Sequence, residues 1–175
     1  VPRQTPKDTS PLVKLARFGQ QATEKGCLRH DGNLLEVTGI EGDYDGGSMT
    51  PDEAVALLEQ HHVRAVVVTT WSHQPVAPRF RVFAPLSQAR PPEERRAFVA
   101  YLNGVLGGVL GKESFALSQS YYIGGPPDGE YRVLVPFDDP DEGFCIDEVD
   151  PTELAALALY PDGKNGKKRP EQLST

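Results

Sequence analysis

Apolar and polar residues alternate with two different periods along the middle of the chain, and these periods predict strands and helices in turn. A period of two predicts strands over Leu34 to Ile40 and over Arg79 to Phe83. A near-continuous apolar run from Arg64 to Thr70 is typical of a central, buried strand. Two further β-prone segments follow later, at Ser120 to Ile123 and at Tyr131 to Pro136.

Helix starts lie between these strands. Thr50 is a predicted N-cap, Pro51 occupies the first helical position, and Glu53 completes a capping box. A period of 3.6 after each start marks one apolar side. Helices are therefore expected to begin at Pro51, at Pro91 to Glu93 and at Leu154, with a further helix over Pro11 to Gly26.

The predicted order is β-α-β-β-α-β, an α+β, ferredoxin-like core with both helices on one sheet face and a candidate active site on the other. The first two strands should be parallel and joined by a right-handed crossover. We divide the chain into a tail and helix (1–33), the core (34–136), an acidic loop with a short C-terminal helix (137–160) and a linker (161–175). Because the chain begins with Val rather than Met and ends in a polar, basic stretch, we expect a piece of a longer polypeptide.

Composition and charge narrow the class of protein. The chain has 175 residues, enough for one domain, and a net charge of −7, which disfavours a wide nucleic-acid-binding face. Carboxylates gather between Asp138 and Asp150, whereas arginines cluster between Arg79 and Arg96. No apolar run reaches the ~20 residues of a membrane span. Two isolated cysteines, Cys27 and Cys145, suit a reducing compartment, so a cytoplasmic location is expected.

The clearest candidate chemistry is an acidic pair that follows the first predicted strand. Asp43 and Asp45 lie two residues apart, and residues so spaced in an extended segment point to the same side. Two carboxylates on one side suit Mg²⁺ or Mn²⁺, which prefer oxygen ligands. An acidic, glycine-rich turn is the alternative, because Asp and Gly are ordinary turn residues. Glu41 is expected to point away and is left out of the set.

Two further polar pairs flank the second and third strands. Ser72 and His73 come directly after the buried strand, where a loop often carries a site, and both could donate to phosphate oxygens. Arg79 and Arg81 share one face of the next strand. Two neighbouring positive charges are stabilised by an anion or a carboxylate between them. Solvated surface charge and a capping serine are the alternatives. If the first and third strands pair, the acids for a metal meet the bases for a phosphate, as phosphoryl transfer requires.

The segment from Lys112 to Tyr122 is polar and aromatic and lies beside a short predicted strand. Glu113 is the best candidate for a third carboxylate, and Ser118 and Gln119 are candidate contacts to a substrate or template. Tyr121 could stack on a base, although packing in the core is the commoner fate of such a side chain.

Taken in this order, the stretches GIEGDYDGG, VVVTTWSHQPVAPRFRVFAPLS and ESFALSQSYYIG resemble the archaeo-eukaryotic primase superfamily, above all the primase-polymerase domains of phage and plasmid replication proteins. The resemblance covers residues 34–125. It implies an RRM-like sheet with a first, acidic motif at Asp43 and Asp45. It also implies a second motif at Ser72 and His73 that contacts a nucleoside triphosphate.

This resemblance implies a DNA-dependent primase and polymerase that makes primers by metal-dependent nucleotidyl transfer on single-stranded DNA. Two Mg²⁺ or Mn²⁺ ions would be held by Asp43, Asp45 and Glu113. The triphosphate would be held by Ser72, His73, Arg79 and Arg81. A helicase, in the same polypeptide or in trans, is the implied partner that grips the template.

The third motif departs from the superfamily pattern, which usually carries another Asp late in the core. No Asp occurs between Asp52 and Asp128, so Glu113 or Asp128 takes that place or the ligand is missing. A missing ligand favours a non-catalytic nucleotide- or DNA-binding module of a replication initiator. A rolling-circle-type endonuclease ranks below both, because His61 and His62 would point to different sides of a helix.

Overall fold

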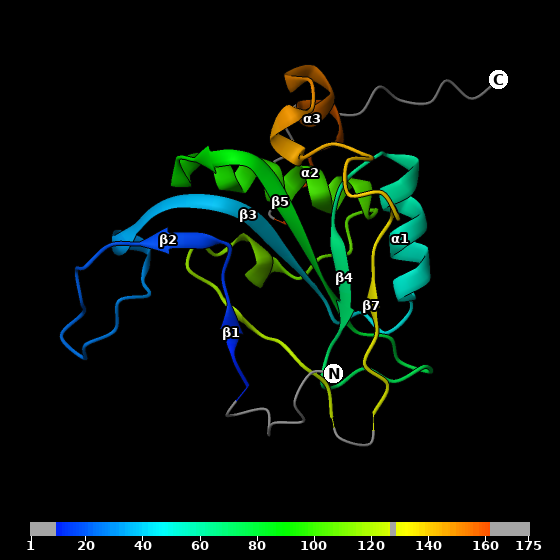
Figure 1. Ribbon diagram of the computed structural model, residues 1–175, viewed down its shortest axis with the longest axis horizontal. Coiled ribbons are helices and arrows are strands. Elements are labelled where there is room, and N and C mark those ends of the chain that lie inside the picture. Colours follow the sequence, from blue (N-terminus) through cyan, green and yellow to red (C-terminus); the bar gives the residue numbers. More distant parts are fainter. Residues whose placement is uncertain (1–9, 127–128, 162–175) are drawn as a thin grey trace.

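The computed structural model describes residues 10–126 and 129–161 and has an α+β fold (Figure 1). Its main sheet has five strands in the order β2-β3-β5-β4-β7, and every neighbouring pair is antiparallel. These strands are β2 (Ala16–Phe18), β3 (Leu34–Tyr44), β4 (Val66–Thr69), β5 (Phe80–Arg90) and β7 (Val133–Leu134). A separate ribbon pairs β1 (Leu12–Val13) with β6 (Tyr121–Tyr122).

Three α-helices are present in the described part of the chain: α1 (Pro51–Gln60), α2 (Arg95–Val105) and α3 (Pro151–Leu157). The predicted capping box of α1 is confirmed, because Thr50 and Glu53 each accept a hydrogen bond from the other's backbone N–H. Helix α1 packs against β4, α2 packs against β3, and α3 packs against α2. None of the helices in this part of the chain is long and apolar enough to cross a membrane.

The central part of the predicted order is confirmed, and its last strand is not. β3 and β4 both run antiparallel to β5, which lies between them, so they are parallel to each other as expected. A ferredoxin-like sheet would place its last strand beside the first. Here β7 instead lies at the far edge beside β4, β6 leaves the main sheet, and β2 takes the edge beside β3. The fold is therefore α+β with a mostly antiparallel sheet.

The helix predicted over Pro11 to Gly26 is wrong. This segment forms β1 and β2, which pair with Tyr121–Tyr122 and with the start of β3. Helix propensity is a weak preference that tertiary contacts override, and the exposed edge of a long strand offers backbone partners to an extended segment. The predicted tail and linker fall largely in residues 1–9 and 162–175, outside the described residues.

The core lies between the sheet and the two longer helices. Ile40, Tyr44, Phe80 and Val82 are almost fully buried on this face, and the rings of Tyr44 and Phe80 stack with centroids 4.7 Å apart. Gly42 also faces the core, where a β-carbon would lie 2.7 Å from the Leu110 side chain. Because successive side chains in a strand alternate between faces, the residues between these ones point to the opposite face.

Candidate functional site

Asp43 and Arg81 form an ion pair on the sheet face away from the helices. They are register partners on β3 and β5, and Arg81 Nε donates to Asp43 Oδ1 at 2.6 Å. Arg81 also donates to the Tyr122 carbonyl, and its guanidinium carbon lies 4.9 Å from the centre of the Tyr121 ring. The guanidinium is therefore held by a carboxylate, a carbonyl and an aromatic face at once.

Burial raises the pKa of Asp43 above its usual value, and the attraction of Arg81 opposes this shift only in part. The negative charges of Asp45 and Glu113 raise the pKa of Asp43 further. Asp45 and Glu113 therefore both act electrostatically on Asp43. Their repulsion of the Asp43 carboxylate is the kind of interaction that a bound cation relieves.

A second ion pair, between Asp45 and Arg79, lies two residues beyond Asp43 and two residues before Arg81. Asp45 directly follows β3 and Arg79 directly precedes β5, with Arg79 Nη1 at 3.8 Å from Asp45 Oδ1. Both side chains are substantially exposed, so this pair is loose where the Asp43–Arg81 pair is tight. The expectation that the two aspartates and two arginines share one sheet face agrees with these contacts.

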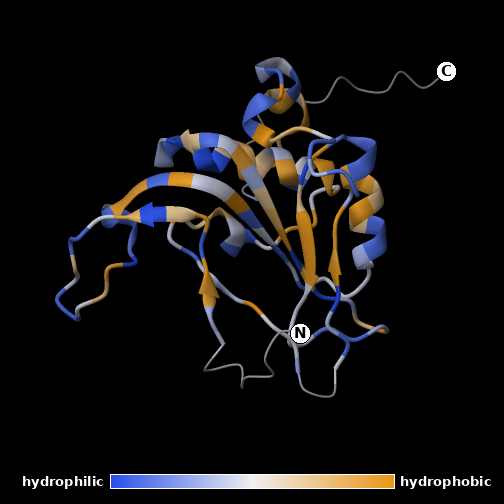
Figure 2. Cartoon of the chain, in the orientation of Figure 1, coloured by the Kyte–Doolittle hydropathy of each residue, from blue (hydrophilic) through white to orange (hydrophobic). Residues whose placement is uncertain are grey.

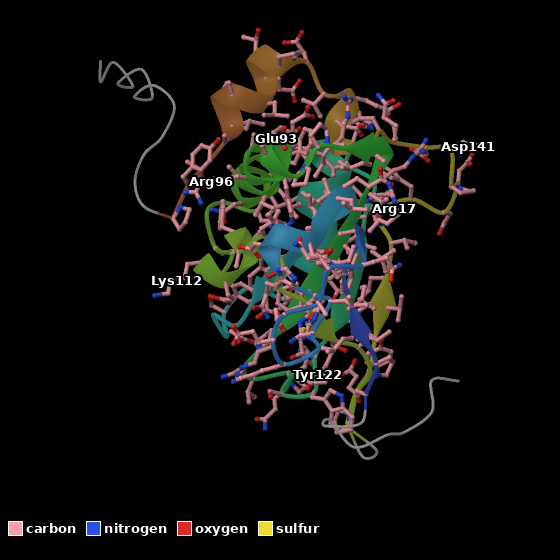
Figure 3. All side chains as sticks on the ribbon, turned by 90° about the vertical axis from the view of Figure 1, so that its left-hand side faces the viewer. Arg17, Glu93, Arg96, Lys112, Tyr122 and Asp141 are labelled. Atoms are coloured by element: carbon pink, nitrogen blue, oxygen red, sulfur yellow. The ribbon has the colours of Figure 1, made fainter. Side chains whose placement is uncertain are left out.

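A small polar cavity of about 90 Å³ opens beside these pairs. Its lining includes Asp45, Arg79, Arg81 and Ser72, which the sequence singled out, together with Thr70, Trp71 and Tyr122. Figure 3 shows Tyr122 at the end of the molecule opposite the acidic-loop residue Asp141. Two guanidinium groups and a hydroxyl around one cavity are donors suited to an anion such as phosphate.

His73 does not line this cavity. Its Nδ1 accepts a hydrogen bond from the backbone N–H of Arg79 at 3.1 Å. The imidazole therefore holds the backbone of the segment that leads into β5 and carries Arg79. A contact between His73 and a nucleotide stays a prediction.

Glu113 lies on a short 3₁₀ helix, η4 (Lys112–Phe115), that contacts β3. The Asp43 N–H donates to Ser114 Oγ at 2.9 Å, and the Gly111 N–H donates to the Asp43 carbonyl at 2.9 Å. These bonds bring exposed Glu113 into the electrostatic neighbourhood of Asp43. Buried Ser114 was missed by sequence reasoning, because its partner lies 71 residues away.

The three residues proposed as template contacts lie in different surroundings. Tyr121 is buried against Arg81, and burial raises the pKa of its hydroxyl. Ser118 is half-buried, and its N–H donates to Asp31 Oδ1 at 3.0 Å. Gln119 is also half-buried, and its amide donates to the Ser120 carbonyl. None of the three lines the polar cavity, so their contact with a template stays a prediction.

The donor set fits a divalent cation in chemical type, because carboxylate oxygens are the ligands that Mg²⁺ and Mn²⁺ prefer. Asp43 and Asp45 are the residues that would hold it. Within residues 10–126 and 129–161, no group of three or more His, Cys, Asp and Glu side chains lies close enough to hold a metal ion. Asp128, the alternative third ligand, lies outside the described residues.

The orientation predicted for Glu41 is wrong. Glu41 lies two residues before Asp43 in the same strand, so its side chain emerges on the same face. It is fully buried and accepts from Lys14 Nζ at 2.8 Å and from Arg95 Nη2 at 2.9 Å. The spacing Glu41, Asp43, Asp45 was the signal that could have shown three acids on one face.

In comparisons with known proteins, no family model, no curated protein and no solved structure matches this chain. The contacts of the candidate site are therefore what supports a function.

Proposed function

We propose that this chain is a metal-dependent nucleotidyltransferase of the primase-polymerase type, which extends or starts a primer on a single-stranded DNA template. The observation that carries the proposal is the meeting of two aspartates and two arginines, at the adjoining ends of β3 and β5, beside one polar cavity. Acids to hold a divalent cation next to bases to hold a triphosphate are what phosphoryl transfer needs.

Asp43 and Asp45 would hold the divalent cation, which lowers the pKa of an attacking hydroxyl and offsets charge on the phosphate when it is bound. The Arg81 guanidinium is already committed to Asp43, the Tyr122 carbonyl and the Tyr121 ring. We therefore assign Arg81 to orienting Asp43. Arg79 is the better phosphate contact, because its guanidinium is more exposed and only loosely paired.

Ser72 completes the proposed triphosphate site. Its side chain is exposed and lines the cavity together with both arginines, so its hydroxyl can donate to a phosphate oxygen. Trp71 lines the same cavity and is the chain's one tryptophan. Its fluorescence therefore reports nucleotide binding at this place without an added label.

The test is primer synthesis on single-stranded DNA with Mg²⁺ or Mn²⁺ and labelled ribo- and deoxyribonucleotides. Asp45→Asn is the decisive variant, because Asp45 is exposed and its loss should leave the thermal unfolding midpoint unchanged. We expect synthesis to fall at least 100-fold in Asp45→Asn and in Asp43→Asn. The matched control is Asp141→Asn, an exposed acid on the distant loop of Figure 3, which should keep full activity.

Synthesis that survives in both Asp43→Asn and Asp45→Asn would refute the catalytic assignment. A parallel titration of the wild type and Arg79→Gln with a nucleoside triphosphate, read by Trp71 fluorescence, separates binding from chemistry. Nucleotide binding that is weakened at least tenfold in Arg79→Gln is the expected result.

A non-catalytic nucleotide- or DNA-binding module is the second candidate. The observation that favours it is the tight engagement of Asp43 by Arg81, together with the lack of a three-acid group in the described part of the chain. This candidate predicts nucleotide binding that depends on Arg79 and no synthesis in any metal.

A further inference from the structure

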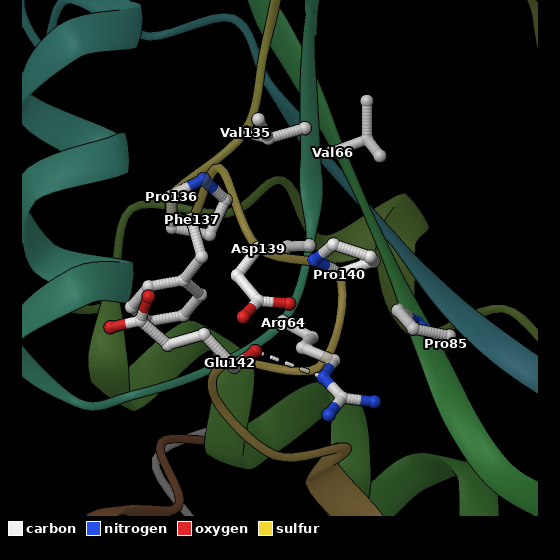
Figure 4. Close-up of a pocket in the computed structure, with 10 residues that line it drawn as sticks. Arg64, Val66, Pro85, Val135, Pro136, Phe137, Asp139, Pro140 and Glu142 are labelled. Atoms are coloured by element: carbon white, nitrogen blue, oxygen red, sulfur yellow. Dashed lines mark hydrogen bonds between the residues drawn. The ribbon is translucent and has the colours of Figure 1, made fainter.

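A second hollow lies on the same sheet face as the candidate site, towards the β7 edge of the sheet. It has a volume of about 160 Å³ and is larger than the polar cavity. Its floor is apolar and comes from Val66, Pro85 and Val135, and Phe137 and Pro140 add apolar side walls (Figure 4). A hollow of this kind suits an aliphatic or aromatic side chain.

The apolar surface continues from this hollow along β7. Val133 and Val135 are 58% and 48% exposed, and they lie two residues apart, so both point to the same side. β7 is the last strand of the sheet order, and Figure 2 shows it, like β4, as a hydrophobic strand. In the described part of the chain no strand pairs with its outer edge, and helix α1 contacts this strand. An edge strand of this kind offers backbone N–H and C=O groups to an added extended segment.

The rim of the hollow is acidic. Asp139 and Glu142 line it, and Asp138 and Asp141 are exposed on the same loop. Arg64 also lines the hollow, but its guanidinium donates to the backbone carbonyl of Glu142 at 3.0 Å (Figure 4). It also donates to the Asp141 carbonyl at 2.7 Å, and the two bonds fix the loop. Four exposed acidic residues on one loop, beside a single guanidinium that is bonded to backbone carbonyls, disfavour phosphate and attract lysine and arginine side chains.

We propose that this hollow and the outer edge of β7 form a docking site for an extended segment of a partner protein. One apolar side chain of the segment fills the space over Val66 and Val135. Lysine or arginine side chains beside it pair with Asp139 and Glu142. The proposal does not rest on nucleotidyl transfer, because it uses none of the residues of the candidate site.

The probe for this site is a random peptide library displayed on phage, selected against the whole chain. We expect the enriched peptides to share an apolar residue flanked by lysine or arginine. A synthetic copy of the enriched peptide should bind at least tenfold more weakly to Val135→Asp than to the wild type. The control Asp45→Asn, altered at the other site, should bind it unchanged.

A charge-reversed chain, Asp139→Lys with Glu142→Lys, makes the test independent of a single variant. It should lose the peptides with basic residues and enrich acidic ones instead, because both replaced residues are exposed on a loop. A library that yields no enriched sequence, or binding that Val135→Asp leaves intact, would overturn the proposal. Two further results would overturn it. If the chain self-associates and Val135→Asp abolishes this, a second copy is the occupant. If Val135→Asp weakens binding to oligo(dT), a nucleic acid is the occupant.

Discussion

The substitution Glu41→Gln is predicted to destabilise this chain far more than its mild chemistry suggests. The Glu41 carboxylate is fully buried and accepts hydrogen bonds from Lys14 Nζ at 2.8 Å, Arg95 Nη2 at 2.9 Å and the Leu15 N–H at 2.5 Å. Glutamine keeps the shape but loses the charge. Two cations whose side chains are almost inaccessible to solvent, Lys14 and Arg95, then lose their counter-ion.

The magnitude follows from burial. Removing one partner of a buried ion pair costs about 3–5 kcal/mol, because the charge left behind stays out of water. A domain of this size is stable by about 5–15 kcal/mol, so this loss is a large share of the total. The matched control is Glu36→Gln on the same strand, where the Arg17–Glu36 pair at 2.8 Å lies at the surface. An exposed pair contributes about 0–1 kcal/mol.

The assay is urea unfolding at pH 7 of the wild type and the two variants, followed by far-UV circular dichroism and by Trp71 fluorescence. The difference between the two glutamine variants is the measured quantity, since both remove one carboxylate charge from β3. A difference smaller than about 1 kcal/mol would refute the reasoning, because it would place Glu41 in a solvated environment like that of Glu36.

Three other local environments give predictions of known sign. Burial lowers the pKa of Lys14 from 10.5 to about 8, so the unfolded chain binds the proton more tightly between these values. From pH 7.5 to 9.5 the free energy of unfolding of the wild type should therefore rise by about 2 kcal/mol relative to Lys14→Met, as measured by urea titration. Thr50→Ala should lower it by about 1 kcal/mol through loss of the α1 N-cap, and unfolding curves that coincide would contradict this. Gly104→Ala should lower the thermal midpoint despite alanine's better helix propensity, because its β-carbon would collide with the Leu157 carbonyl. A higher midpoint would show that α3 can move aside at no cost.

Features with a local physical cause could be predicted from the sequence. The alternation of side chains along β5 places Phe80 and Val82 in the core and Arg81 on the other face. The capping box likewise fixes where α1 begins. The same alternation predicts that Asp43 and Arg81 share one face if β3 and β5 pair, as they do in the structure.

Features that depend on distant pairings could not be predicted. Nothing near Leu12 or Ala16 indicates that their strands pair with Tyr122 and Val37. The residues of β7 likewise do not indicate which edge it occupies, and the place beside β3 is taken by β2. The orientation of Glu41 is a different case, because the period of two already assigned it to the face of Asp43.

Three acids, two in β3 and one directly after it, form a graded series along one sheet face. Glu41 is 0% exposed and held by two cations, Asp43 is 8% exposed with one tight arginine, and Asp45 is 56% exposed with its arginine at 3.8 Å. A buried pair is expensive to break, whereas an exposed and loosely paired group can exchange its partner for a ligand. Stability should therefore be most sensitive to substitution at Glu41, and ligand binding should be most sensitive at Asp45. Asp43 lies between them and has both properties, because its raised pKa reflects burial while its neighbours Asp45 and Glu113 add negative charge that a cation would relieve.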